Sequence, residues 1–436
     1  MSRKIKVLSL VLILNIYSLF SQKNISNERQ LFIDDFIVDS INNLEYELHE
    51  PIQVENLSLP LGYYQSLIKY QNEYLLYYRE YLKNYNGKLF DGNPGEITKV
   101  LKSSNGVNWE DLIVNNENES INVVFYEPPY NHNFTPFIDT NPNSKLNEKF
   151  KAVSGLPKVG GLYLFVSADG NKWTRRKKPL FEKSCKFCFD SQNILFWSEV
   201  EKKYVLFYRK HVNGLRSIAK RTSLNLIDWT NEKVLDINEK GEHLYTSGLF
   251  PYYREKNIYI GFATRFFPDL GNSTDIVLLT SREGNGVQRK YKQAIIKPGF
   301  EKKDWENRNN YITLNGLVPF DSNHDVLLAR GKHYIFRKDG FASLKSNFEE
   351  GYFVTRPVKF DKTRITLNFK TSAGGYIKIL ILDNEDNVLN SNTKDERIIG
   401  NKTEFQYDLD FELSHEPVRI KFVLKEAELY SFIFSL

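Results

Sequence analysis

The chain has little cysteine and lacks the motifs that identify several common enzyme classes. Only two of its 436 residues are cysteine. It contains no Walker A loop, no convincing GxGxxG motif and no GxSxG nucleophile elbow. No long amphipathic helix and no low-complexity linker is evident. These absences exclude the usual signatures of nucleotide-binding proteins and of serine hydrolases.

The two cysteines form a single CxxC pair, Cys185 and Cys188. A structural zinc site commonly needs two such pairs, or one pair and two histidines, and no HxxxH pattern lies nearby. A thioredoxin-like site needs a βαβ setting, which is absent here. We therefore expect neither a metal nor a cofactor, and the pair either forms a disulfide or remains as two thiols.

Neither positive nor negative charge dominates the chain. The 59 Lys and Arg residues and the 54 Asp and Glu residues are interspersed, for a net charge of +5. Without residues 1–22, which carry three positive charges, the net charge is about +2. This balance gives no case for nucleic acid as a partner.

Residues 1–22 have the layout of a secretory signal peptide. A basic head with Arg3, Lys4 and Lys6 precedes an apolar run from Val7 to Phe20. The run is short and is followed at once by polar residues, which argues against a membrane span. We expect a secreted or periplasmic protein.

Tyrosine and phenylalanine are abundant, with 26 and 31 residues. Both favour strands, and the apolar runs are short and separated by turn residues. The sequence therefore predicts an all-β protein.

Four similar stretches divide the chain at intervals of about 60 residues, a spacing typical of propeller blades. They are SSNGVNW (103–109), SADGNKW (167–173), TSLNLIDW (222–229) and TSREGNGV (280–287). Each follows a strand-like run, and the polar-Gly pairs suit tight turns. The best-defined unit, residues 192–237, contains four strand-like runs and predicts one four-stranded blade.

The same scheme predicts a five-bladed β-propeller over residues 23–343. The early run LFIDDFIV, Leu31–Val38, is expected to complete the fifth blade and close the ring. Residues 344–436 alternate apolar and polar positions without the repeated turn, which predicts a C-terminal β-sandwich. The pair Gly374–Gly375 is expected to form a tight turn in it.

Two aspartates on inner strands are the candidate catalytic residues. Asp139 belongs to the second predicted blade and Asp190 opens the third. Inner strands line the channel of a propeller, so acids on neighbouring blades can meet there. Hydrolysis of a glycosidic bond commonly uses such a pair of carboxyl groups. A structural role in a turn is the alternative for each.

Seven further residues are weaker candidates for substrate contacts, because they are polar or aromatic and lie near the expected channel. Each of them could instead have a structural role. The tryptophan could stack on a sugar ring, and the arginines could bind hydroxyl or charged groups. These candidates are Asp35, Asn193, Trp197, Arg209, Glu242, His243 and Arg265.

Several stretches resemble secreted bacterial proteins described as glycoside hydrolase family 32/43-like five-bladed propellers. They include LFIDDFIV, PFIDTNP, LYLFVSADGNKW, FDSQNILFW and RKDGFASL. The resemblance covers nearly the whole chain after residue 22, and it implies a carbohydrate-active enzyme. Families 32 and 43 carry an acid on the first inner strand, whereas GYYQSLIKY has none.

The sequence thus predicts an exported glycoside hydrolase that acts on oligosaccharides from plant or algal polysaccharides. A non-catalytic carbohydrate-binding propeller is the alternative, and a non-hydrolytic sugar enzyme is a third possibility. Neither the sugar nor the oligomeric state is indicated.

Overall fold

The computed structural model describes residues 23–54, 59–114, 122–182, 188–306, 312–389, 396–413 and 416–435. The chain divides into two compact units. The propeller unit comprises Leu31–Asp34 and Tyr46–Ser343. The sandwich unit comprises the described residues up to Gln30, Asp35–Glu45 and Leu344 onward. Residues 23–30 and 35–45 therefore belong to the sandwich unit and not to the propeller. The predicted signal peptide lies outside the described residues.

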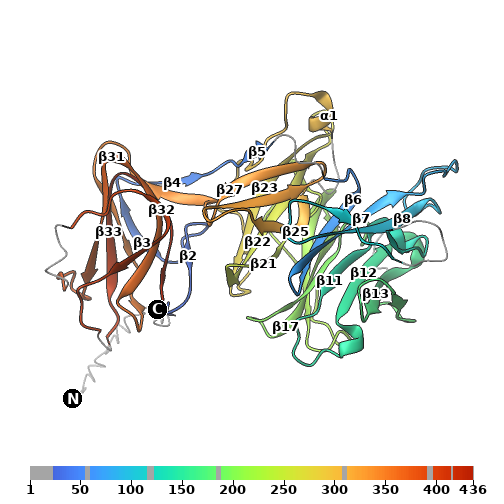
Figure 1. Ribbon diagram of the computed structural model, residues 1–436, viewed down its shortest axis with the longest axis horizontal. Helices are drawn as coiled ribbons and strands as arrows, with labels where there is room; N and C mark the ends of the chain where they lie inside the picture. Colours follow the sequence, from blue (N-terminus) through green and yellow to red (C-terminus); the bar gives the residue numbers. More distant parts are fainter. Residues whose placement is uncertain are drawn as a thin grey trace, which may run out of the picture. The chain divides into compact units, whose positions relative to one another are not determined.

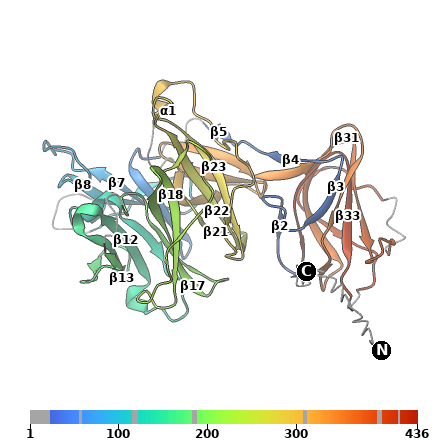
Figure 2. The same cartoon turned by 180° about the vertical axis from the view of Figure 1, so that it is seen from behind.

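The predicted five-bladed propeller is confirmed. Within the described chain, each inner strand contacts the inner strand of the next blade, in the order β6, β11, β16, β21, β25 and back to β6. The inner strands β25 and β6 pair in parallel at Leu314 and Ser66, and the strands within each blade pair antiparallel. Figures 1 and 2 show the blades in chain order, from β6–β8 in cyan to β25 and β27 in orange.

The first three blades have these elements. Blade 1 contains β6 (Tyr63–Tyr70), β7 (Glu73–Tyr81), β8 (Glu96–Ser103), β9 (Glu110–Asp111) and β10 (Val123–Phe125). Blade 2 contains β11 (Thr135–Ile138), β12 (Phe150–Leu156), β13 (Gly161–Ser167), β14 (Thr174–Arg175) and β15 (Phe181–Glu182), with 3-10 turns at Tyr130–Asn133, Leu146–Glu148 and Pro157–Val159. Blade 3 contains β16 (Ile194–Ser198), β17 (Lys203–Val212), β18 (Leu215–Ser223) and β19 (Lys233–Val234).

The last two blades complete the ring. Blade 4 contains β20 (His243–Leu244), β21 (Phe250–Tyr252), β22 (Glu255–Phe267), β23 (Ser273–Arg282) and β24 (Val287–Gln288). Helix α1 (Lys302–Trp305) precedes blade 5, which contains β25 (Ile312–Pro319), β26 (His324–Ala329), β27 (Lys332–Arg337) and β5 (Ile52–Val54). No helix among the described residues is long and apolar enough to span a membrane.

The strand that closes the ring differs from the expected one. β5 pairs with β27, with Ile52 opposite Ile335. The predicted closing run divides instead: Leu31 and Ile33 are buried in the core between blades 4 and 5, and Val38 belongs to the sandwich strand β3. The run is apolar because its residues are buried in two separate cores. It does not pair as a strand in the propeller ring.

The repeated sequence turn has one hydrogen-bond pattern. After β8, Gly106 N donates to Ser103 Oγ, and Asn108 N donates to Asn105 Oδ1. Ser167 and Asp169 accept the same bonds after β13, and Ser223 and Asn225 accept them after β18. A short polar side chain can satisfy the main chain of its own turn. The repeat therefore marks the turn after the third strand of each of these blades.

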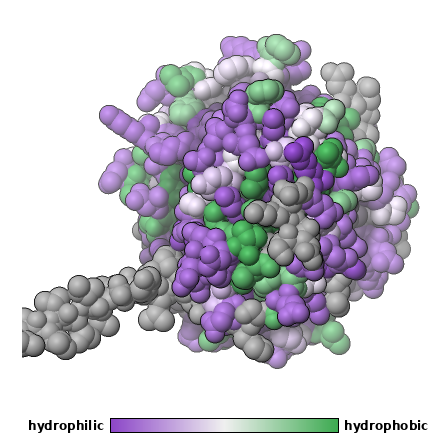
Figure 3. Space-filling model, turned by 90° about the vertical axis from the view of Figure 1, so that its left-hand side faces the viewer, coloured by the Kyte–Doolittle hydropathy of each residue, from purple (hydrophilic) through white to green (hydrophobic). Residues whose placement is uncertain are grey.

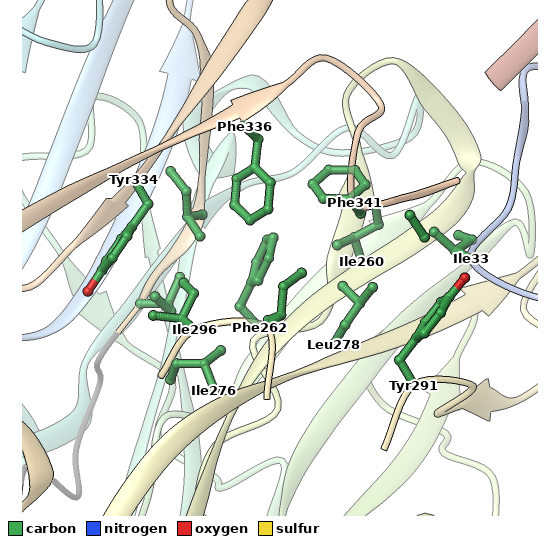
Figure 4. Packing of buried hydrophobic residues seen from close by; sticks show 14 of the residues in the cluster. Ile33, Ile260, Phe262, Ile276, Leu278, Tyr291, Ile296, Tyr334, Phe336 and Phe341 are labelled. Atoms are coloured by element: carbon green, nitrogen blue, oxygen red, sulfur yellow. The ribbon is translucent and has the colours of Figure 1, made fainter. Parts of the chain in front are cut away.

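Apolar side chains fill the space between neighbouring blades. Between blades 4 and 5, Phe262, Phe336 and Phe341 pack ring against ring, with centroids 5.3–6.0 Å apart (Figure 4). Ile33 and Tyr291 lie in the same cluster. Burying a side chain of this size contributes about 1.5–3 kcal/mol to stability. This packing holds the inner strands, and with them the channel residues, in fixed positions.

The sandwich unit is built on two long strands, β31 (Arg364–Leu382) and β33 (Arg419–Phe434). The first part of β31 pairs with the end of β33 and with β32 (Asn401–Asp408). Its second part pairs with the start of β33, which also pairs with β29 (Gly351–Thr355), itself bonded to β3 (Val38–Asn42). Further strands of the described chain are β1 (Lys23–Asn24), β2 (Gln30–Leu31), β4 (Glu45–Leu48), β28 (Ala342–Lys345) and β30 (Val358–Lys359).

The pair Gly374–Gly375 does not form the expected tight turn. Both residues lie within β31, where the register with β33 shifts between Thr371 and Tyr376. A Cβ at Gly375 would come within 2.5 Å of the main-chain oxygen of Glu426, so glycine permits a close approach of two main chains at this irregularity.

The face of the sandwich unit seen in Figure 3 is largely hydrophilic, with a hydrophobic strip near its middle.

Candidate active site

The inner strands of the propeller begin at one end of the channel and finish at the other. Asn133, just before β11, donates from Nδ2 to the main-chain oxygens of Phe189 and Ser191, just before β16, at 2.7 and 2.8 Å. The two strands therefore start at the same end. We call this end, which carries Asp190, the Asp190 mouth, and the opposite end, which carries Trp197, the Trp197 mouth.

Asp190 lies at the start of the third inner strand and is held by its own turn. Phe189 has a positive φ of 63°, and Asn193 closes the turn by donating from Nδ2 to the oxygens of Phe189 and Ser191. The Asp190 side chain is 21 % exposed and accepts a hydrogen bond from Arg209 Nη2 at 2.9 Å. Burial raises the pKa of Asp190, although Arg209 opposes that rise. A carboxyl group of this kind suits proton donation.

Arg209 is buried and has unused donors. Among the described residues, its Nε and Nη1 atoms have no hydrogen-bond partner. The guanidinium lies over the ring of Tyr245 at 4.9 Å, and Arg216 lies over the same ring at 5.4 Å. An unpaired buried N–H is costly, and the contact with the Tyr245 ring offsets part of that cost.

A second acidic group faces Asp190 from blade 1. Asp91, His132 and Asp190 each place one oxygen or nitrogen atom within 4.8 Å of the others. Asp91 lies in the loop between β7 and β8, and its side chain is 72 % exposed. His132 Nδ1 lies 2.6 Å from Arg79 Nη1 and 2.9 Å from Glu96 Oε1. These contacts fix the imidazole between the two aspartates.

Tyr64 occupies the start of the first inner strand, where the sequence offers no acid. It has a positive φ of 52°, at a register irregularity between Tyr63 and Ser66. Such a conformation is strained for a bulky residue and recurs at functional sites. The Tyr64 ring lies edge-on to His132, and burial raises its pKa far above the ordinary value. Tyr64 therefore stays neutral and forms a wall of the Asp190 mouth.

The structure does not bring Asp139 and Asp190 together. Asp139 follows the end of β11, six residues beyond Asn133, and a strand advances about 3.3 Å per residue, so the two aspartates lie about 20 Å apart. Asp139 is buried, lies 2.6 Å from Lys151 Nζ and accepts a hydrogen bond from the Tyr204 hydroxyl at 2.8 Å. Its contacts tie blades 2 and 3 together at the Trp197 mouth.

Glu242 and Arg265 belong to a buried ionic network on blade 4. Glu242 pairs with Arg289 and lies 3.7 Å from Arg265. Arg265 in turn donates two hydrogen bonds to Asp275, at 2.8 and 2.6 Å. Their charges satisfy one another, so neither residue is brought to Asp190.

The remaining predicted residues divide between several places. His243 accepts a hydrogen bond from Arg216 N at 3.1 Å, and so supports the arginine that stacks on Tyr245. Asn193 and Arg209 contact the Asp190 turn and its carboxylate, as described above. Trp197 lines a cavity at the other mouth. Asp35 is exposed and belongs to the sandwich unit.

Sequence reasoning missed the blade 1 side of this mouth. Asp91 lies in DGNPGE and His132 in NHN, both outside the strand-like runs that guided the prediction. In each case the sequence signal was a cluster of turn residues, which marks a loop. Loops carry functional residues more often than the strands they connect.

The cysteine pair is described only in part. Cys188 is disulfide-bonded and buried beside the Asp190 turn. Cys185, the other cysteine of the chain, lies outside the described residues. The disulfide resolves the choice left open by the sequence for Cys188, and it anchors the segment that leads into Asp190.

No protein-family model and no curated protein matches the chain. Solved structures that are similar to it include an arabinoxylan arabinofuranohydrolase of glycoside hydrolase family 43 from Bacillus subtilis. The two chains are 14 % identical, the match covers 86 % of this chain and 96 % of that one, and the TM-score is 0.40. A family 32 β-fructofuranosidase from Bombyx mori has 11 % identity, 89 % and 95 % coverage, and a TM-score of 0.41. At these identities the likeness concerns the fold and assigns no role to a side chain.

Proposed function

We propose that the protein is an exported glycoside hydrolase that acts on oligosaccharides from plant or algal polysaccharides at the Asp190 mouth. The observation that carries this proposal is the Asp190 carboxyl group, whose pKa burial raises and which lies within 4.8 Å of a second carboxylate, Asp91. A carboxyl group whose pKa is raised, beside a second and exposed carboxylate, is the kind of pair that glycosidic bond cleavage uses.

In the proposed reaction, Asp190 transfers its proton to the glycosidic oxygen as the bond from that oxygen to the anomeric carbon breaks. Asp91 attacks the same carbon and forms a glycosyl ester. Asp190 then accepts a proton from water, which hydrolyses the ester and regenerates both groups. Carboxyl groups about 5–5.5 Å apart act in this retaining manner, whereas inverting pairs are about 6.5–9.5 Å apart. One oxygen of Asp91 and one of Asp190 lie within 4.8 Å of each other, and the anomeric configuration of the first product decides between the two outcomes.

The basic and aromatic groups around Asp190 would hold the substrate. The positive charges of Arg209 and Arg216, both over the Tyr245 ring, would attract a carboxylate or sulfate group of the substrate. Tyr245, between Arg209 and Arg216, offers a fixed ring. We accordingly expect acidic oligosaccharides to be better substrates than neutral ones of equal length.

The proposal is tested by reducing-end release from neutral, uronic-acid and sulfated oligosaccharides. Asp190→Asn and Asp91→Asn should each lower kcat by about 10²–10⁴-fold, while Asp228→Asn, in an exposed turn of blade 3, should retain full turnover. NMR of the first product would then give the anomeric configuration. Full activity in Asp190→Asn would contradict the assignment.

One observation favours the alternative of a sugar-binding protein without catalysis. At the Asp190 mouth, the first inner strand carries Tyr64 near its start and Thr246 precedes the fourth, and neither residue is an acid. A protein that binds the same oligosaccharides but releases no reducing ends, with binding unchanged in Asp91→Asn, would support that alternative.

A further inference from the structure

The channel has a second hollow that the proposed reaction does not use. At the Trp197 mouth lies a cavity of about 450 Å³, within the range of about 300–1,000 Å³ typical of ligand sites. All five inner strands contribute to its wall, through Leu67, Ile138, Trp197, Phe250 and Leu314. It is separated from Asp190 by the length of the inner strands.

The cavity has aromatic walls and a polar rim. Six of its lining residues are aromatic: Phe137, Phe196, Trp197, Phe250, Tyr252 and Tyr253. Polar side chains reach the same cavity from Lys69, Gln71, Thr140, Glu199, Lys256 and Asn315. Tyr253 is 42 % exposed, so the cavity opens to solvent on that side. This mixture suits a ligand with apolar faces and polar edges.

The two accessible rings are held rigidly. Tyr253 donates from its hydroxyl to Asp325 Oδ1 at 2.7 Å and lies edge-on to Tyr252. Trp197 lies edge-on to Tyr204, with ring centroids 5.0 Å apart. Rings fixed in this way bind a flat ligand face with little further loss of conformational freedom.

Glu199, the acid among the residues lining this cavity, is already paired. Both oxygens of Glu199 accept hydrogen bonds from Lys256, at 2.7 Å. Asp139, next to the lining residue Ile138, is buried against Lys151. Asn315 has a positive φ of 54° and donates from Nδ2 to Leu67 O at 3.2 Å, which fixes its amide in the wall. The groups present favour binding over acid–base chemistry.

We propose that the Trp197 mouth is a second, non-catalytic carbohydrate-binding site, which takes a sugar ring between Trp197 and Tyr253. The apolar C–H face of a pyranose would stack on these rings, and its hydroxyl groups would bind the rim amides and the Lys69 ammonium. This site does not depend on catalysis at Asp190, so the two proposals can be tested independently.

The test uses the full chain in an Asp190→Asn background, so that no probe is consumed. A glycan array of neutral and acidic plant and algal oligosaccharides is probed with this protein and with versions that also carry Trp197→Ala or Tyr253→Leu. Trp305→Ala is the matched control, because Trp305 is 48 % exposed and is not among the residues lining the cavity. Melting temperatures verify that each variant folds.

We expect at least one oligosaccharide whose affinity falls about tenfold or more in both cavity variants and is unchanged in Trp305→Ala. Added Arg209→Met should leave binding of that oligosaccharide unaltered. Equal binding of every sugar by Trp197→Ala and Trp305→Ala would overturn the proposal. Binding of the apolar dye anilinonaphthalene sulfonate at this cavity, with no sugar bound there, would overturn it as well.

Discussion

Gln192, on blade 3, donates a hydrogen bond from Nε2 to the main-chain oxygen of Gln65, on blade 1, at 3.0 Å. These blades are not neighbours, so the bond crosses the channel. Thr313, on blade 5, donates from its hydroxyl to Gln65 Oε1 at 2.7 Å. The three buried side chains form a partition between the Asp190 mouth and the Trp197 mouth.

Gln192→Leu should destabilise the propeller by about 1–3 kcal/mol, because the Gln65 oxygen would lose its buried donor. The free energy of unfolding is measured by urea denaturation. Gln288→Leu, at an exposed position on β24, is the control and should change it by less than about 0.5 kcal/mol. Equal stability of the two variants would show that the crossing bond contributes nothing.

Activity should depend on the protonated form of Asp190 and so decline as pH rises through its pKa, which burial raises. Arg209 favours the charged carboxylate, so Arg209→Met should raise that pKa further and move the alkaline limb of kcat/KM to higher pH. Lys210→Met, which removes an ion pair with Glu232, should leave the limb in place. A limb that moves to lower pH would contradict the role given to Asp190.

Chelation should not reduce activity. Asp91, His132 and Asp190 have the side-chain types of a cation site, but the Arg209 guanidinium lies 2.9 Å from Asp190 and would repel a divalent cation. The rate of reducing-end release should be the same after dialysis against EDTA as before. A loss that Ca²⁺ restores would instead assign these residues to a metal.

Glu242→Gln should act on stability and not on substrate binding. It leaves the buried Arg289 without its partner, and breaking a buried ion pair costs about 3–5 kcal/mol. The midpoint of urea unfolding should fall sharply, while KM stays unchanged. Glu239→Gln, which breaks the exposed pair with Lys292, should have little effect on either. A raised KM with normal stability would return Glu242 to the substrate site.

His211 should make the protein acid-sensitive. Burial, with Arg209, Arg216 and His243 nearby, lowers its pKa from 6.5 to about 4. The unfolded chain therefore binds more protons in this window, so stability falls as pH decreases from about 6.5 toward 4. His211→Gln should flatten that decline, measured as the melting temperature at several pH values. The partly exposed His324→Gln variant serves as the control, and a decline of unchanged steepness in His211→Gln would exclude His211 as its source.

The blades were predictable because their signals are local. The side chains of Ser167 and Asp169 bond to the main chain of their own turn, so the pattern survives in the sequence. Asp190 was selected as a candidate for the same reason, since it lies shortly before a well-defined strand, β16, and its catalytic role stays a prediction. It was not predictable that β5, and not Leu31–Val38, closes the ring. An apolar run does not indicate which core will bury it.

The partners of the candidate residues were harder to predict. Asp139 directly follows an inner strand, β11, and this position at the strand's end places it at the other mouth. Arg265 is satisfied by Asp275 from the adjacent strand β23, a pairing that depends on register. Asp91 comes to Asp190 from a different blade, and only the closed ring brings the two together.

Ring closure by β5 also sets an order of events during synthesis. β27 follows β5 by nearly the whole length of the propeller, so the closing pair cannot form until blade 5 has left the ribosome. Until then blade 1 has no inner-strand neighbour on that side, and its β6 edge remains open to other chains. For the export that we propose, this order would favour a chain that crosses the membrane unfolded and closes its ring afterwards.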